Sequence, residues 1–173
     1  MKDFLLNLLR AYPRLILLFA LITKDPYLFV GILIEEQINH FLKYIVVKPL
    51  LGDKKYPIMG SGARPKGARN CGIWANNKNV QPKSYGMPSG HSAAALFFST
   101  YKILELMNNK SNNTVLYFIY VLLALIIPYS RLYFKCHTIQ QAIVGGISGI
   151  ILGYYWFKHK SDFYKFINYN ITK

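Results

Sequence analysis

The chain has 173 residues, about one domain, and combines 53% hydrophobic residues with 21 Lys and Arg against 7 Asp and Glu, a formal net charge of +14. This apolar content excludes a disordered chain and weakens a nucleic-acid-binding role for the basic residues. Two cysteines are too few for a disulfide scaffold, and neither lies in a zinc-binding or redox motif. The composition therefore predicts a membrane protein with locally concentrated positive charge.

Five stretches are apolar enough to enter or cross a bilayer, for which a helix needs roughly 20 residues. They cover 4–22, 27–47, 88–107, 114–133 and 138–157. The first resembles the core of a secretory signal, but Pro13 interrupts it and Lys24-Asp25-Pro26 follows it, so we expect a retained helix. The sequence predicts an all-α fold, a multi-pass transmembrane bundle of five or six helices. We expect one membrane-embedded domain over 1–173 that includes a short basic tail at 158–173.

A long polar segment, about Lys48 to Met87, separates the second and third stretches. It is rich in Gly, Pro, Asn and Lys, and Asp53 is its single acidic residue. Such a loop within a compact domain is usually either functional or disordered. If each stretch crosses the membrane once, this loop and the link at 130–137 share one side. We therefore expect a basic active-site loop at one membrane face.

The first motif is Tyr85-Gly-Met-Pro-Ser-Gly-His-Ser92, at the start of the third stretch. With Pro88 at the first helical position, the free N–H groups of the helix start can approach an anion. Ser89 adds a hydroxyl, Gly90 removes the bulk of a Cβ, and His91 adds an ionisable ring. Taken alone, the segment is equally well explained as a Gly-Pro turn with an incidental histidine.

The second motif is Ser130-Arg-Leu-Tyr-Phe-Lys-Cys-His137, followed by Thr138-Ile-Gln-Gln141. Arg131 offers a planar fork suited to two phosphate oxygens. Gln141 shares a helical face with His137 and can accept a hydrogen bond from its ring, which leaves the other ring nitrogen free to attack. Small residues suited to close helix packing continue along this face: Gly145, Gly149 and Gly153. A glycine-rich packing helix with a capping histidine is the alternative, but it does not explain Arg131.

A polar stripe crosses the second stretch. It consists of Glu36, Asn39, His40 and Lys43, at spacings of three and four residues. Ionisable groups within a membrane helix are costly and indicate a functional interior face, although Lys43 is also placed to extend its ammonium to the interface. Arg64-Pro65 follows in the basic loop.

Together these residues resemble the three-part signature of the type-2 phosphatidic acid phosphatase superfamily, over roughly 36–153. The matching order is Lys43, Arg64-Pro65, Pro88-Ser-Gly-His91, and Ser130-Arg131 with His137 six residues after the arginine. Tyr85-Gly-Met-Pro-Ser, Ser-Arg-x-Tyr and His-Thr-x-x-Gln are further similar to the dolichyl-diphosphatase branch, whose members also carry Gln after the distal His.

Two departures from the superfamily pattern stand out. Six residues usually separate the lysine from Arg-Pro, and that position is Pro57 here, so we align Lys43 and treat Leu50 to Ala63 as an insertion. Lys54 and Lys55 are alternatives for the motif lysine. Gln141 stands where most of the superfamily has Asp, and a neutral amide stabilises an imidazolium less than a carboxylate does.

The resemblance implies a metal-independent lipid phosphatase without cofactors that hydrolyses a polyprenyl (dolichyl-type) diphosphate through a phosphohistidine. The implied catalytic residues are His137, His91 and Gln141, and the implied phosphate-binding residues are Lys43, Arg64, Ser89, Gly90 and Arg131. The partners are a lipid phosphate and the bilayer, with no nucleic acid. The expected location is the endoplasmic reticulum membrane of a eukaryote or otherwise the plasma membrane, with the catalytic face toward the lumen or periplasm.

Three alternatives remain at this point. One is a broad lipid phosphate phosphatase acting on phosphatidate. A second is a catalytically impaired lipid-binding protein, an alternative that rests on Gln141. The third, a vanadium haloperoxidase, shares the motifs, but that family is soluble, and the five apolar stretches argue against it.

Overall fold

The structure, a computed structural model, describes residues 2–68, 71–72, 82 and 84–171. Its elements are α1 (Lys2–Ile22), α2 (Pro26–Phe41), the π-helix η1 (Leu42–Val47), α3 (Lys48–Leu51), β1 (Lys55–Tyr56), β2 (Gly60–Ser61), α4 (Gly90–Asn108), α5 (Thr114–Tyr133), α6 (Ile139–Lys158) and α7 (Lys160–Ile171). The regular secondary structure of the described chain is helical apart from the antiparallel β1–β2 pair, in which Lys55 pairs with Ser61. This short hairpin, within the long basic loop, is the one departure from the all-α prediction.

Each predicted apolar stretch is helical, but the start of the third differs from the prediction. The third begins at Gly90 rather than Pro88, because the Ser89 side chain accepts the N–H of Ser92 and acts as the N-cap. Pro88 therefore precedes the cap and does not occupy the first helical position. The predicted basic tail is also helical, since α7 covers most of it.

Within the residues that the structure describes, two helices are long and apolar enough to cross a membrane by length and composition, over Asp3–Ile22 and Thr114–Tyr133. Large apolar side chains also stay exposed on the outer faces of α5 and α6, among them Phe118, Leu125, Ile143, Ile147 and Ile151. Contiguous exposed apolar surface of this kind suits contact with lipid rather than water.

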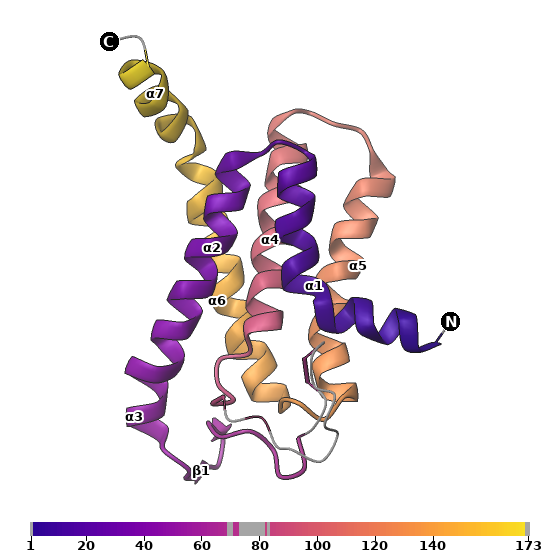
Figure 1. Cartoon of the computed structure of the whole chain (residues 1–173), viewed down its shortest axis with the longest axis vertical. Coiled ribbons are helices and arrows are strands. Elements are labelled where there is room, and N and C mark those ends of the chain that lie inside the picture. Colours follow the sequence, from indigo (N-terminus) through magenta and orange to yellow (C-terminus); the bar gives the residue numbers. More distant parts are fainter. Residues whose placement is uncertain (1, 69–70, 73–81, 83, 172–173) are drawn as a thin grey trace.

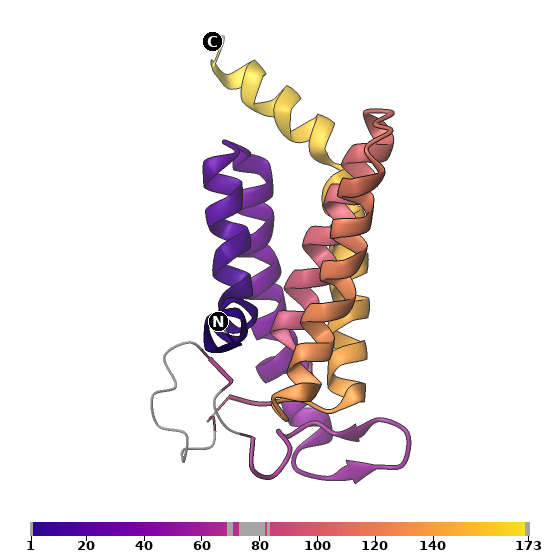
Figure 2. The same cartoon turned by 90° about the vertical axis from the view of Figure 1, so that its right-hand side faces the viewer.

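The long helices form two layers, which Figure 2 shows edge-on: α1 and α2 pair on one side, and α4, α5 and α6 lie on the other. Helix α4 is central, and its buried side chains include Ala94, Phe97, Phe98 and Tyr101. It packs backbone to backbone on α6, because a Cβ at Gly145, Gly149 or Gly153 would collide with the carbonyl oxygens of Ser89, Ala93 or Phe97. This close approach, which the glycine spacing predicts, fixes the start of α4 against the start of α6.

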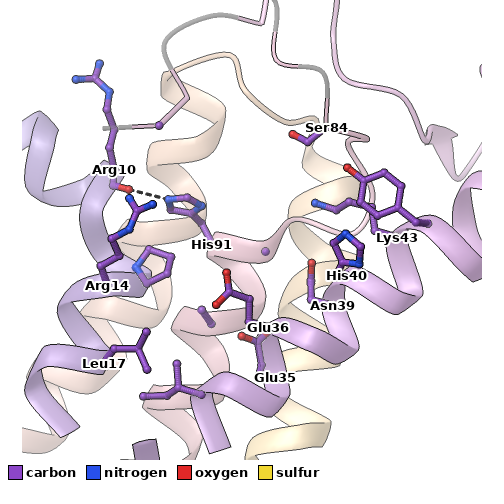
Figure 3. Close-up of a pocket in the computed structure, with 16 residues that line it drawn as sticks. Arg10, Arg14, Leu17, Glu35, Glu36, Asn39, His40, Lys43, Ser84 and His91 are labelled. Carbon is purple, nitrogen blue, oxygen red and sulfur yellow. Dashed lines mark hydrogen bonds between the residues drawn. The ribbon is translucent and has the colours of Figure 1, made fainter. Parts of the chain in front are cut away.

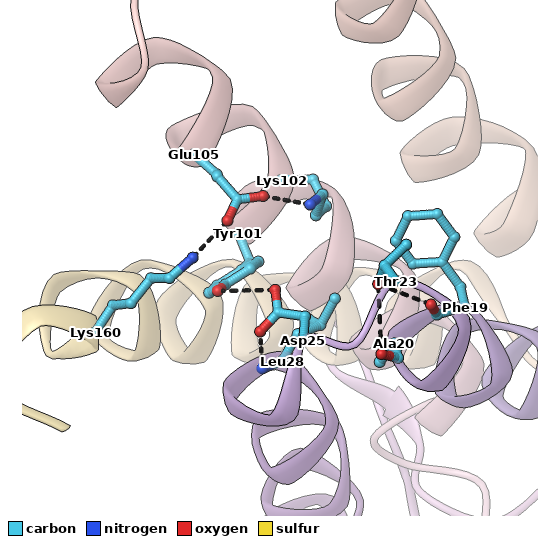
Figure 4. A network of polar contacts seen from close by, with 9 residues as sticks. All are labelled: Phe19, Ala20, Thr23, Asp25, Leu28, Tyr101, Lys102, Glu105 and Lys160. Carbon is cyan, nitrogen blue, oxygen red and sulfur yellow. Dashed lines mark hydrogen bonds and ion pairs between the residues drawn. The ribbon is translucent and has the colours of Figure 1, made fainter. Parts of the chain in front are cut away.

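The helices are joined at the end away from the basic loop by a polar network (Figure 4). Glu105 of α4 pairs with both Lys102 and Lys160, so it links α4 to the start of α7. Asp25 caps α2 by accepting the Leu28 N–H at 2.9 Å. These contacts hold the helices in register at the far end.

All the segments that carry the motifs meet at the other end of the bundle. Figure 1 shows η1 with α3, the hairpin, the start of α4, the end of α5 and the start of α6 gathered there. The 23–26 and 108–113 turns lie at the opposite end, as the crossing pattern predicts.

Candidate active site

His137 is a buried histidine just before α6, and its two ring nitrogens have different partners. Nδ1 lies 3.0 Å from Oε1 of Gln141. Nε2 lies 3.2 Å from Nη1 of Arg64. An arginine N–H can only donate, so Nε2 must carry the lone pair and Nδ1 the proton. The surroundings therefore fix the tautomer that leaves Nε2 available to attack.

The orientation of the Gln141 amide is fixed independently. Its Nε2 donates to the carbonyl oxygens of Ser61 at 2.8 Å and Ala63 at 2.7 Å, and these groups can only accept. The amide oxygen must therefore face His137. Gly86 permits this packing, because a Cβ there would lie 2.6 Å from Gln141 Nε2.

Burial is the main influence on the charge of His137. Together with the nearby cations Arg64, Arg131 and Lys43, burial lowers the pKa of His137 to about 2, against a smaller opposite effect from its bond to Gln141. A lowered pKa keeps the imidazole neutral at every pH above that value, and the neutral ring is the nucleophilic form. The His137 ring is thus neutral at physiological pH.

Arg64 ties the basic loop to this histidine. Besides its contact with His137, its guanidinium donates to the carbonyl oxygen of Cys136 at 3.0 Å and to the hydroxyl of Ser84 at 2.8 Å. Ser84 was not predicted, although it directly precedes the first motif. These bonds hold the Arg64 fork beside Nε2 of His137, where it can also meet phosphate oxygens.

Arg131 is the largest fully buried side chain, 1% exposed, near the end of α5. Its Nη2 donates to the Cys71 carbonyl at 2.6 Å. Within the described residues, its Nε and Nη1 have no hydrogen-bond partner. Buried donors are normally paired, and unpaired ones need an explanation such as an absent ligand. A cationic fork with free N–H groups is suited to an oxyanion.

The first motif supplies the start of α4. Ser89 is buried and accepts the Ser92 hydroxyl at 3.0 Å, which leaves its own O–H free to donate. Its N–H donates to the Gln141 carbonyl at 3.0 Å, so the starts of α4 and α6 are joined. His91 follows, and its Nε2 lies 3.0 Å from the carbonyl oxygen of Arg10 (Figure 3). A carbonyl only accepts, so Nε2 carries a proton and Nδ1 is the nitrogen left for a substrate.

Lys43 lies in η1, and its side chain is buried near the other cations. Single π-helical turns are frequent at functional sites, since they shift side chains out of the α-helical register. The alternatives Lys54 and Lys55 are both exposed, on and beside the hairpin. Lys43 is therefore the lysine that the fold directs toward the histidines.

A cavity of about 440 Å³ adjoins these residues between α1, α2 and α4. Lys43, Ser84, Gly90 and His91 line one part of it. Its other lining includes Arg10, Arg14, Leu17, Glu35, Glu36 and Asn39 (Figure 3). The cavity thus begins beside the second histidine and extends between the helices.

The two cysteines, separated by 65 residues, form a disulfide that the sequence analysis did not predict. Cys136 directly precedes His137, and the carbonyls of both cysteines accept hydrogen bonds, Cys71 from Arg131 and Cys136 from Arg64. The cross-link therefore holds the acceptors of two site arginines. With two cysteines only one pairing within the chain is possible, but isolated cysteines carry no motif, so the sequence contains no signal that the bond forms.

Comparison with known families tests the resemblance directly. A model of the PAP2 superfamily matches residues 27–164. The chain belongs to the PAP2 superfamily. Helix α1 lies outside the matched region, whereas every motif residue lies within it. No solved structure matches the chain.

Several curated proteins of the PAP2 superfamily type are similar to the chain. Dolichyldiphosphatase 1 of Homo sapiens is 28% identical over 138 residues, covering 73% of this chain and 49% of that protein. Dolichyldiphosphatase 1 of Dictyostelium discoideum is 28% identical over 152 residues, 82% of this chain and 55% of the relative. Lipid phosphate phosphatase gamma of Arabidopsis thaliana is 34% identical over 82 residues, 43% of this chain and 35% of the relative. The chain spans about half the length of the dolichyldiphosphatases that it matches.

Proposed function

We propose that the protein is a metal-independent lipid phosphate phosphatase that works through a phosphohistidine. One observation carries this proposal: the unprotonated Nε2 of His137 lies 3.2 Å from Arg64 in a buried, cation-rich setting. Arg131 supports it with two unpaired buried N–H groups among the described residues. An oriented neutral imidazole within a set of preorganised donors is suited to nucleophilic attack on phosphorus.

The proposed reaction has two steps. In the first, Nε2 of His137 bonds to phosphorus and the phosphorus–oxygen bond to the leaving group breaks. His91, which takes up a second proton at Nδ1 when the anionic substrate binds, gives that proton to the leaving oxygen. In the second, His91 takes a proton from water, which attacks phosphorus and breaks the bond to His137, releasing phosphate. Arg64, Arg131 and Lys43 neutralise the phosphoryl oxygens throughout, assisted by the Ser89 hydroxyl and the Gly90 N–H.

The preferred substrate in this proposal is a polyprenyl diphosphate of the dolichyl type. The similarity to dolichyldiphosphatase 1 over most of the chain supports this choice. A broader lipid phosphate such as phosphatidate is the second candidate, supported by the shorter match to lipid phosphate phosphatase gamma. In both cases a lipid tail accounts for the apolar bundle and a phosphate accounts for the basic end.

Phosphate release from dolichyl diphosphate and from phosphatidate distinguishes the two substrates. We expect the purified full chain in detergent to hydrolyse the diphosphate with the higher kcat/KM, with activity kept in excess chelator. Faster turnover of phosphatidate would favour the broader enzyme. Activity lost on chelation would overturn the metal-independent mechanism, and hydrolysis of neither substrate would overturn the phosphatase assignment.

The proposed setting is a multi-pass membrane protein with one domain over 1–173, whose catalytic end faces the lumen or periplasm. The Cys71–Cys136 disulfide supports this orientation, because disulfides persist in oxidising compartments. In a eukaryote the expected location is the endoplasmic reticulum membrane.

Reducing this disulfide should lower both stability and activity. The chain-entropy model gives a cross-link of this span a stabilisation of about 4 kcal/mol, and its loss also loosens the carbonyls that hold Arg64 and Arg131. We expect a lower unfolding temperature and severalfold slower phosphate release in reductant. The matched control is the Cys71→Ser/Cys136→Ser double variant, which should be impaired already and indifferent to reductant. Full activity with both thiols titrated as free would contradict this role.

A further inference from the structure

Arg14 is a charged residue within a helix that is otherwise apolar enough to span a membrane. It lies in the middle of α1, in the span Asp3–Ile22. Charged side chains in such segments are costly, and they usually face an interior cavity and serve a function. Arg14 lines the cavity that begins at Gly90 and His91. Arg14 belongs to none of the sequence motifs, and α1 lies outside the region that matches the family.

The position of this cavity relative to the histidines suggests what it receives. In an in-line displacement the leaving group departs on the side of phosphorus opposite the attacking atom. His137 attacks from one side, and His91, the proposed donor to the leaving oxygen, borders the cavity. The leaving group of the proposed reaction therefore enters the space lined by Arg14.

The charge of the leaving group separates the candidate substrates. When the substrate is a lipid monophosphate, the leaving group is an alcohol, which has no charge for an arginine to bind. When a lipid diphosphate is attacked at its terminal phosphorus, the leaving group is a lipid monophosphate, which carries negative charge. An arginine fork is suited to two oxygens of such a phosphate.

The surroundings of Arg14 leave it available for this role. In the described part of the chain it forms no hydrogen bond or ion pair, and in Figure 3 its side chain extends from α1 toward the His91 ring. Arg10 and Lys43 are the other cations in the cavity lining. Glu36 points into the same space from α2, so it competes with an anion for Arg14.

We propose that Arg14 forms a subsite for the second phosphate of a lipid diphosphate, next to the phosphate attacked by His137. In this step Nε2 of His137 bonds to the terminal phosphorus and the bridging phosphorus–oxygen bond breaks. The electron pair stays on the bridging oxygen, which takes the Nδ1 proton of the doubly protonated His91, and Arg14 binds the departing lipid monophosphate. The subsite rests on the proposed function and narrows it to diphosphates.

The test compares two substrates with the same chain, farnesyl diphosphate and farnesyl monophosphate, on the full protein in detergent. Arg14→Gln should lower kcat/KM for the diphosphate about tenfold or more, the scale of a lost charge-assisted hydrogen bond. The monophosphate rate should change less than about twofold, since its leaving group offers nothing to Arg14. Lys24→Gln, in the turn that follows α1, is the matched control and should alter neither rate.

A second variant is expected to change kcat/KM for the diphosphate in the opposite direction. Glu36→Gln removes the competing carboxylate, so it should raise kcat/KM for the diphosphate and leave the monophosphate unchanged. If Arg14 and Glu36 served only as a structural pair, both variants would lower both rates. Equal losses on the two substrates, or no loss for Arg14→Gln, would overturn the subsite. A wild-type protein that hydrolyses phosphatidate but no diphosphate would instead overturn the proposed substrate.

Discussion

Replacing His137 by alanine should abolish phosphate release, with kcat lower on the order of 10⁴-fold or more, as expected when a covalent nucleophile is removed. The neutral Nε2 of this residue is the one nitrogen in the described site that is both unprotonated and held beside an arginine fork. Labelling with phosphate from the substrate tests the covalent step directly. The wild-type protein quenched during turnover should carry a base-stable, acid-labile phosphate on His137, and the variant should carry none.

His159→Ala is the matched control for this variant. His159 is exposed at the far end of α6, where it contacts Asp162 and no residue of the site. We expect wild-type turnover and wild-type labelling from it. Unfolding temperatures in detergent should be similar for both variants, which separates a chemical loss from a folding loss. Turnover by His137→Ala near the wild-type rate would show that another group attacks phosphorus.

Much of this site could be predicted because its residues carry periodic or motif signals. Spacing alone predicts that Gln141 can reach His137, since residues four apart share a helical face. The same periodicity predicts the contact of α6 with α4, because glycines at every fourth position leave the backbone accessible. Local chemistry and helix geometry determine these features, so a single sequence contains them.

Other features depend on where distant segments meet, which a single sequence does not encode in its local pattern. The pairing of Cys71 with Cys136 requires the loop to fold back onto the start of α6. The place of Arg14 in the same cavity lining as His91 requires α1 to pack on α4, and no motif in the sequence indicates that contact. Helix α4 begins at Gly90, two residues later than predicted. The reason is local, because the Ser89 side chain caps the helix and serine is among the preferred N-cap residues.

Gln141 is the position at which the fold changes the interpretation of the sequence. Compared with the usual Asp, a neutral amide stabilises an imidazolium less, which kept open an impaired site. In the structure the amide also holds the basic loop, because its nitrogen donates to the carbonyl oxygens of Ser61 and Ala63, just before Arg64. A carboxylate has no N–H to donate, so it cannot orient His137 and hold this loop together. The glutamine therefore couples His137, the proposed nucleophile, to the Arg-Pro segment.

This coupling predicts that Gln141→Glu is strongly impaired, although it introduces the carboxylate typical of the superfamily. The variant leaves two carbonyl oxygens without donors and sets a negative charge against them, at a cost of about 1–3 kcal/mol for each lost bond. With Arg64 displaced from His137, we expect kcat/KM to fall on the order of 10²-fold. Gln140→Glu makes the same chemical change one residue away, beside Gly60, and should retain nearly full activity. A Gln141→Glu protein as active as the wild type would show that the amide nitrogen is dispensable and that the loop carrying Arg64 is held by its other contacts.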